Sequence, residues 1–129
     1  MTLWSSSVCK GELEQCRKIL ETDPDHLGAL EIAAQAYWYE ENYREVVQLT
    51  SRLIRLHPHE PGYRYMRGMA YLSMDRLKLA ETDFKQALVQ SNDFKFCEQV
   101  RMALTALEGY IDSRNQPAPN AGGYSQTIN

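Results

Sequence analysis

Histidine and cysteine are the residue types in this chain that could bind a metal ion or attack a substrate. The histidines are His26, His57 and His59, and the last two flank Pro58, a residue type that ends helices. A structural zinc site needs several ligands that converge on one point with tetrahedral geometry. Histidines in proline-containing turns favour exposed side chains instead, so we predict no metal site and no cofactor.

The cysteines offer no better route to catalysis. Cys9, Cys16 and Cys97 are an odd set without a Cys-x-x-Cys pair, and no histidine is arranged near them as a base. Such a set indicates reduced thiols, as in a cytoplasmic protein. Gly122 and Gly123 stand alone and do not form a phosphate-binding motif. We therefore predict that the chain is not an enzyme and that it is cytoplasmic.

Length and composition indicate one globular domain. The chain has 129 residues, of which 43% are hydrophobic and 24% are charged. Its formal net charge of -3 leaves no basic excess for nucleic acid or an anionic membrane. No apolar run approaches the roughly 18 residues of a membrane span, and the N-terminus lacks the features of a secretory signal. We therefore expect another protein or a peptide as the partner.

Apolar residues recur at helical spacing along most of the chain. Leu13, Cys16, Ile19 and Leu20 lie on one face of a first helix, which Pro24 ends. The same spacing predicts further helices at residues 27–40, 43–56, 62–74, 77–90 and 94–111. The fold class is therefore expected to be all-α.

Turn-forming residues separate these helices. Gly11, next to Lys10, predicts a turn before the first helix, because glycine adopts positive φ without strain. Asn42 predicts the left-handed residue between the second and third helices. Residues 113–129 are rich in proline and glycine and carry almost no charge. Such a segment cannot offset its ordering entropy by burial, so we predict a flexible tail.

These turns recur with a fixed period. Pro24 and Pro58 are 34 residues apart, and the same step from Pro58 reaches Asn92 in another turn. A period of this length is typical of helical repeat proteins, in which each unit buries one face against its neighbours. Two units, residues 27–60 and 61–94, fit the period.

The second unit resembles the tetratricopeptide repeat family. Gly68 and Tyr71 reproduce the family's Gly-x-x-Tyr spacing. Ala80 and Phe84 reproduce its Ala-x-x-x-Phe spacing, and Ala87 falls at its third small position. The first unit is similar at Leu30, Ala34, Tyr37, Val46, Leu53 and Pro58. The resemblance extends over about residues 10–111.

The resemblance implies a right-handed α-solenoid of antiparallel helix pairs within residues 1–112. It would contain about two full repeats, a partial N-terminal repeat and a capping helix at residues 94–112, before the tail at 113–129. It implies that the following residues pack the repeats together: Ala34, Tyr37, Val46, Gly68, Tyr71, Ala80, Phe84 and Ala87.

Four positions depart from the family pattern, namely Thr50, Arg64, Arg67 and Asn92. Thr50 stands where the first repeat would have a large aromatic residue. Gly68 should cost about 1 kcal/mol against alanine inside a helix. We expect close helix approach across Ala80 to compensate, and Ala34 to face Val46 in the same way.

The family lines a concave face with the first helix of each pair, which implies a binding groove. Aromatic and methionine side chains there offer large, adaptable contact area for an apolar or amphipathic peptide. The alternative is that many of these side chains belong to the core, as a helical apolar stripe usually does. The implied groove residues are Glu31, Gln35, Trp38, Tyr39, Tyr65, Met66, Met69 and Ser73, with Gln99 and Ala103 from the cap.

Some members of the family bind a partner's C-terminal carboxylate through basic residues on these helices. The matching positions here are Glu31, Ile32, Gln35, Gly62 and Met66, so the basic clamp is absent. The resemblance therefore implies a protein–protein interaction adaptor or scaffold for an apolar or amphipathic segment.

Self-assembly is the alternative function. An incomplete first repeat would leave an apolar edge around Trp4, Leu13 and Ile19, which a second copy could cover. In a variant of this hypothesis, the tail of one copy lies in the groove of another.

Overall fold

The computed structural model describes residues 6–116 of the chain, with side chains from residue 11 onward. This part of the chain is all-α, as expected. Its helices are α1 (Ser6–Thr22), α2 (Leu27–Tyr39), α3 (Tyr43–Leu56), α4 (Pro61–Ser73), α5 (Leu77–Gln90) and α6 (Phe94–Asn115).

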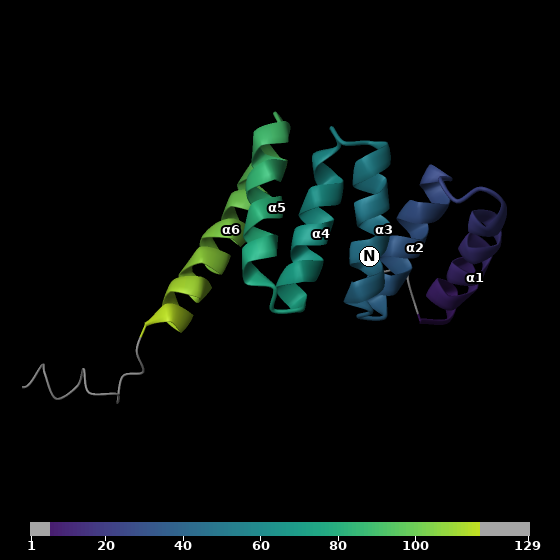
Figure 1. Ribbon diagram of the computed structural model, residues 1–129, viewed down its shortest axis with the longest axis horizontal. Helices are drawn as coiled ribbons and strands as arrows, with labels where there is room; N and C mark the ends of the chain where they lie inside the picture. Colours follow the sequence, from purple (N-terminus) through teal and green to yellow (C-terminus); the bar gives the residue numbers. More distant parts are fainter. Residues whose placement is uncertain (1–5, 117–129) are drawn as a thin grey trace, which may run out of the picture.

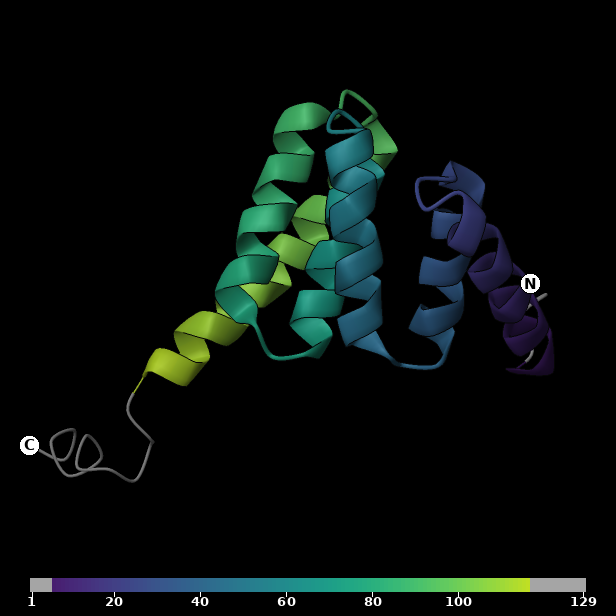
Figure 2. The same ribbon diagram turned by 45° about the vertical axis from the view of Figure 1, so that its right-hand side comes forward.

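Each helix packs against the next one in the sequence (Figure 1). Short connections alternate between the two ends of the row, so neighbouring helices run antiparallel. Figure 2 shows the same order from a second angle, with α1 and α2 side by side at one end. The fold is therefore an array of helical hairpins. No helix within residues 6–116 combines the length and apolar character needed to cross a membrane.

The 34-residue period of the sequence is present in the helix boundaries. α2 and α4 each have 13 residues and start 34 residues apart, and α3 and α5 each have 14 and do the same. The two non-glycine residues with positive φ in the described chain, Glu41 (59°) and Asp75 (62°), keep this step. Asn42 was expected in that conformation and has φ of −93° instead. Asn42 is the N-cap residue of α3. The left-handed conformation falls one residue earlier, on Glu41, where the preceding helix ends.

Side chains cap the N-termini of α2, α4 and α6. The Nδ1 of His26 accepts a hydrogen bond from the Ala29 amide (3.1 Å), which assigns this histidine a capping contact at α2. Glu60 accepts from the Gly62 amide (3.2 Å) at α4, and Asp93 accepts from the Phe96 amide (2.9 Å) at α6. An aspartate cap such as Asp93 contributes about 1 kcal/mol.

Two helices extend beyond their predicted limits. The turn predicted at Gly11 is wrong, because α1 runs through this residue to Thr22. One glycine costs only about 1 kcal/mol in a helix, and burial of Leu13 and Cys16 compensates. α6 extends to Asn115, past the predicted end at 111, and Arg114 in its last turn pairs with Asp75 (2.7 Å). The predicted flexible character of residues 117–129 lies outside the described residues.

Two clusters of buried hydrophobic side chains lie toward the two ends of the row, and other buried residues of α2, α3 and α4 belong to neither cluster: Leu30, Ala34, Val46, Thr50, Leu53, Ile54 and Ala70. An N-terminal cluster joins α1 and α2 through Leu13, Cys16, Ala29, Ala33 and Ala36, with Leu49 of α3 against it. A C-terminal cluster joins α5 and α6 through Ala80, Phe84, Ala87, Val100, Leu104 and Leu107. Residues of α4 pack against this cluster.

Gly68 allows the closest approach between α4 and α5. A β-carbon at this position would lie 2.7 Å and 2.8 Å from atoms of the Phe84 ring. The expected partner was Ala80, but the helix register places the aromatic ring over the glycine. The missing side chain therefore makes room for Phe84, which is fully buried.

Candidate functional site

Two adjoining hollows lie between α2 and α4, and each has a volume of about 430 Å³. They share Gln35, Gly62 and Met66, so they form one continuous depression, which we call the α2–α4 groove. The acidic hollow is completed by Glu31, Ala34, Leu53, Glu60 and Tyr63. The aromatic hollow is completed by Trp38, Tyr39, Tyr65 and Met69.

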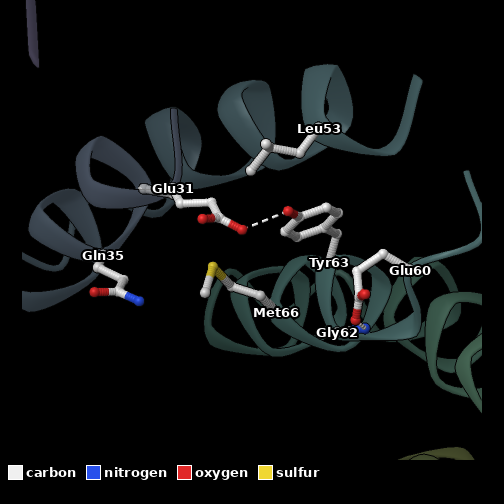
Figure 3. Close-up of a pocket in the computed structure, with 8 residues that line it drawn as sticks. Glu31, Gln35, Leu53, Glu60, Gly62, Tyr63 and Met66 are labelled. Atoms are coloured by element: carbon white, nitrogen blue, oxygen red, sulfur yellow. Dashed lines mark hydrogen bonds between the residues drawn. The ribbon is translucent and has the colours of Figure 1, made fainter. Parts of the chain in front are cut away.

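A hydrogen bond joins the two helices across the acidic hollow. The Tyr63 hydroxyl of α4 donates to the Glu31 carboxylate of α2, and Figure 3 shows the two side chains directed toward each other. Burial raises the pKa of Tyr63 above its ordinary value, and the hydrogen bond to Glu31 raises it further. The negative charges of Glu31 and Glu60 act on this pKa in the same direction. The hydroxyl thus stays protonated and holds the Glu31 side chain in place.

The aromatic hollow is built from rings that are partly held by the core. Trp38 meets Tyr43 edge to face, with ring centroids 5.1 Å apart. Tyr65 contacts the rings of Phe84 (5.8 Å) and Phe96 (5.7 Å). The Gln99 amide of α6 donates to the Tyr65 hydroxyl (3.2 Å), which orients this ring from behind. Tyr65 therefore packs against the C-terminal cluster and also lines the aromatic hollow.

A buried ion pair fixes the orientation of α4. Arg67 donates to both carboxylate oxygens of Asp83 in α5, at 2.7 Å and 2.8 Å, and to the Ser51 hydroxyl of α3 at 3.0 Å. The Asp83 side chain is only 3% exposed, and Arg64 lies 3.9 Å from it. Because Arg67 follows Met66 directly, this network also sets the position of the groove wall.

The structure brings together all but one of the eight residues named for the groove from sequence. Glu31, Gln35, Trp38, Tyr39, Tyr65, Met66 and Met69 line the two hollows. Ser73 does not, because it is the last residue of α4 and is exposed beyond them. Ala103 of α6 packs in the C-terminal cluster instead. The role of these residues in binding remains a prediction.

Sequence reasoning missed Tyr63. One period earlier the chain has Ala29, which is 2% exposed, so the repeat pattern marks this position as core. Tyr63 reaches the groove because its long side chain extends past that core position toward Glu31. The signal that could have identified it is the substitution of alanine by a large polar aromatic residue.

The histidines and cysteines do not form a reactive site in the described chain. No three His, Cys, Asp or Glu side chains among residues 11–116 come together in a way that could hold a metal ion. Cys16 and Cys97 are buried free thiols. Burial, followed by the negative charge of Glu12, raises the pKa of Cys16 and disfavours its reactive thiolate. Cys9 lies outside the residues whose side chains are described.

No protein-family model matches the chain, and no curated protein sequence matches it significantly. What the structure shows of residues 6–116 is an all-helical array whose helices pack in sequential order.

Proposed function

We propose that the chain is a tetratricopeptide-like interaction module that binds an apolar or amphipathic segment of another protein in the α2–α4 groove. The observation that carries this proposal is the aromatic hollow, where Trp38, Tyr65, Met66 and Met69 converge. The shared 34-residue step of the α2–α3 and α4–α5 pairs supports the family resemblance. It is also consistent with a right-handed solenoid.

The chemistry of the groove suits a peptide. Aromatic rings provide large, rigid contact area, and methionines adapt to differently shaped side chains. Two joined hollows of about 430 Å³ each offer space for successive side chains of an extended or helical segment. The described part of the lining contains no lysine, arginine or histidine, which disfavours a ligand that ends in a carboxylate.

We also propose that the chain has no catalytic activity of its own. The buried cysteines and the capping contact of His26 support this view. His57 and His59 are exposed in the α3–α4 turn and lie outside the groove. A metal analysis of the purified protein tests for a metal-dependent site, and a stoichiometric metal with an open coordination position would contradict the proposal.

A binding experiment tests the groove directly. Trp38 becomes the single tryptophan when Trp4 is replaced by phenylalanine, so its fluorescence reports occupancy of the groove. Partners that co-purify from the source cells are divided into overlapping peptides and titrated against this Trp4→Phe protein. We expect binding to be lost on replacement of Gln35 and Met66 by alanine, since both residues line both hollows.

The matched control is the double replacement of Leu79 and Met102 by alanine. These side chains are 48% and 68% exposed and lie outside the groove. Tyr65 and Met69 are less suitable for substitution, because both pack against the C-terminal cluster. Binding that survives the Gln35 and Met66 changes but not the control changes moves the site away from the groove.

Self-assembly is the second candidate, and exposed apolar side chains favour it. Phe94, Met102 and Tyr110 on α6 are 72%, 68% and 49% exposed. At the other end of the row, Ile19 is 39% exposed, whereas Leu13 is buried and does not contribute to a free edge. Trp4 lies outside the described residues. Static light scattering over a range of protein concentrations distinguishes a monomer from a homo-oligomer.

A further inference from the structure

The two ends of the α2–α4 groove differ in charge. Glu31 and Glu60 line the acidic hollow, whereas none of the described residues that line the aromatic hollow is charged. Glu31 is half-buried and its hydrogen-bond partner is the neutral hydroxyl of Tyr63. The exposed Glu60 carboxylate accepts from the Gly62 amide at the start of α4. Both acids therefore have neutral partners.

Neither acid has a cationic partner among the residues whose side chains are described. Among the described residues, no lysine, arginine or histidine lies within 4.0 Å of Glu31 or Glu60. Other acids of the chain do have such partners, as Asp83 has in Arg67 and Glu81 has in Lys85. A carboxylate in a partly enclosed hollow is stabilised by a nearby cation, which forms a short charge-assisted hydrogen bond with it.

We propose that the occupant of the groove is a peptide segment in which a lysine or arginine precedes or follows an apolar side chain at a fixed distance. The cation pairs with Glu31 and Glu60 in the acidic hollow, and the apolar side chain enters the aromatic hollow beside Trp38. This inference rests on the proposed function and specifies the chemistry of the ligand. The observation behind it is the negative charge of Glu31 and Glu60 in the acidic hollow, which a cationic side chain of the ligand complements.

The geometry of α2 sets the distance between the two ligand groups. Glu31 and Trp38 are seven residues apart on this helix, which is two turns, or about 10 Å along its axis. An extended peptide advances about 3.3 Å per residue, so the cation and the apolar anchor are about three residues apart. In a helical ligand they are about seven residues apart.

Synthetic peptides with blocked ends test this inference. The probe carries one arginine three residues before a pair of leucines, and two reference peptides replace the arginine by neutral citrulline or by glutamate. Binding is followed by Trp38 fluorescence in the full-length Trp4→Phe protein. We expect the arginine peptide to bind at least about tenfold more tightly than the citrulline peptide, and the difference to decrease as salt is added. Moving the arginine next to the leucines removes the advantage.

Two charge-neutralising double variants assign the effect to the acidic hollow. Replacing Glu31 and Glu60 by glutamine keeps an acceptor for Tyr63 and for the Gly62 amide, and we expect it to abolish the preference for arginine. Replacing Glu21 and Glu98 by glutamine removes the same net charge from exposed positions outside the groove and leaves the preference unchanged. Thermal unfolding of each variant verifies that it is folded.

The outcomes separate this inference from the proposed function. Equal binding of the arginine and citrulline peptides, with loss on the Gln35 and Met66 changes, overturns the inference and supports the groove. Failure of all three peptides to change the Trp38 signal overturns the inference, while loss of natural partner binding on the Gln35 and Met66 changes still supports the groove. Trp38 signals that change with protein concentration alone identify a second copy as the occupant and overturn the inference.

Discussion

The α2–α3 pair and the α4–α5 pair share one backbone period but have different interiors. At equivalent positions, the first pair has Ala33 and Leu49 where the second has Arg67 and Asp83. Leu30 of the first pair is fully buried, and its equivalent in the second is Arg64. The helix lengths and turns are nevertheless the same in both pairs. The period of small residues and turns therefore determines the hairpin, and the remaining interior positions accept either apolar or ionic side chains.

A second difference concerns the closest contact within each pair. The second pair combines Gly68 with the ring of Phe84, and the equivalent positions of the first pair are Ala34 and Thr50. Ala34 and Thr50 are both fully buried, and the Thr50 hydroxyl donates to the Val46 carbonyl of its own helix (2.7 Å). The pair with the larger residue on its first helix, Ala34, thus has the smaller residue at the equivalent position of its second helix, Thr50.

The largest effect is expected from Asp83→Ala. The change leaves Arg67 and Arg64 in a largely buried site without their counter-charge, which should lower the free energy of unfolding by about 3 kcal/mol. Urea denaturation measures this loss. The double change Arg67→Ala with Asp83→Leu copies Ala33 and Leu49 of the first pair and should recover most of the stability. A double variant that is as unstable as Asp83→Ala contradicts the equivalence of the two interiors.

Gly68→Leu should be nearly as damaging. The new side chain overlaps the Phe84 ring, and overpacking of this kind costs about 2–3 kcal/mol. Gly109→Leu in α6 is the matched control, because a β-carbon there would meet no atom within 4 Å. The control should be neutral or slightly more stable, since leucine is the better helix former. Thermal melting of both variants checks this, and equal melting temperatures for Gly68→Leu and the wild type exclude the described register.

Thr50→Phe places the residue of the second pair into the first and should cost about 2 kcal/mol, because Thr50 is fully buried and the larger ring overpacks its site. The additional change Ala34→Gly should provide room for the ring and restore part of the loss, although glycine itself costs about 1 kcal/mol in a helix. Urea denaturation of the single and double variants measures the coupling. Strictly additive effects of the two changes show that these positions do not face each other.

The smallest effect is expected from Tyr63→Phe, whose equivalent in the first pair is Ala29. Loss of the hydrogen bond to Glu31 should cost about 1 kcal/mol at neutral pH. The pKa of Tyr63 is raised in the folded chain, so its hydroxyl stabilises the fold fully below the ordinary tyrosine pKa of about 10. This contribution is lost as pH rises above that value, because the unfolded chain then releases its proton first.

The difference in unfolding free energy between the wild type and Tyr63→Phe should therefore shrink from neutral to alkaline pH. Comparison of the two proteins cancels the titration of the other tyrosines. A difference that stays constant up to alkaline pH means that the pKa of Tyr63 is not raised in the folded chain.

The helices could be predicted closely, whereas the contacts between them could not. The bounds of α3 and α5 follow from apolar spacing and turn residues, which act locally. Arg64 and Arg67 were visible as departures from the family pattern, but their partner Asp83 depends on how two helices face each other. The residues that line the groove could be predicted because the repeat period marks the positions on α2 and α4 that face it. Tyr63 was missed because its equivalent one period earlier is the buried Ala29. Sequence thus indicates which positions face inward, and the structure adds which side chains meet.

The two buried clusters have a consequence for cooperativity. α2 contributes to the N-terminal cluster and α4 packs against the C-terminal cluster, so the two helices that line the groove contact different clusters. We expect each cluster to open locally with its own free energy. A ligand seated between α2 and α4 contacts both helices and couples the opening of the two clusters. Amide hydrogen exchange should therefore slow in α1 and in α6 together when the groove is filled, although neither helix lines either of its two hollows.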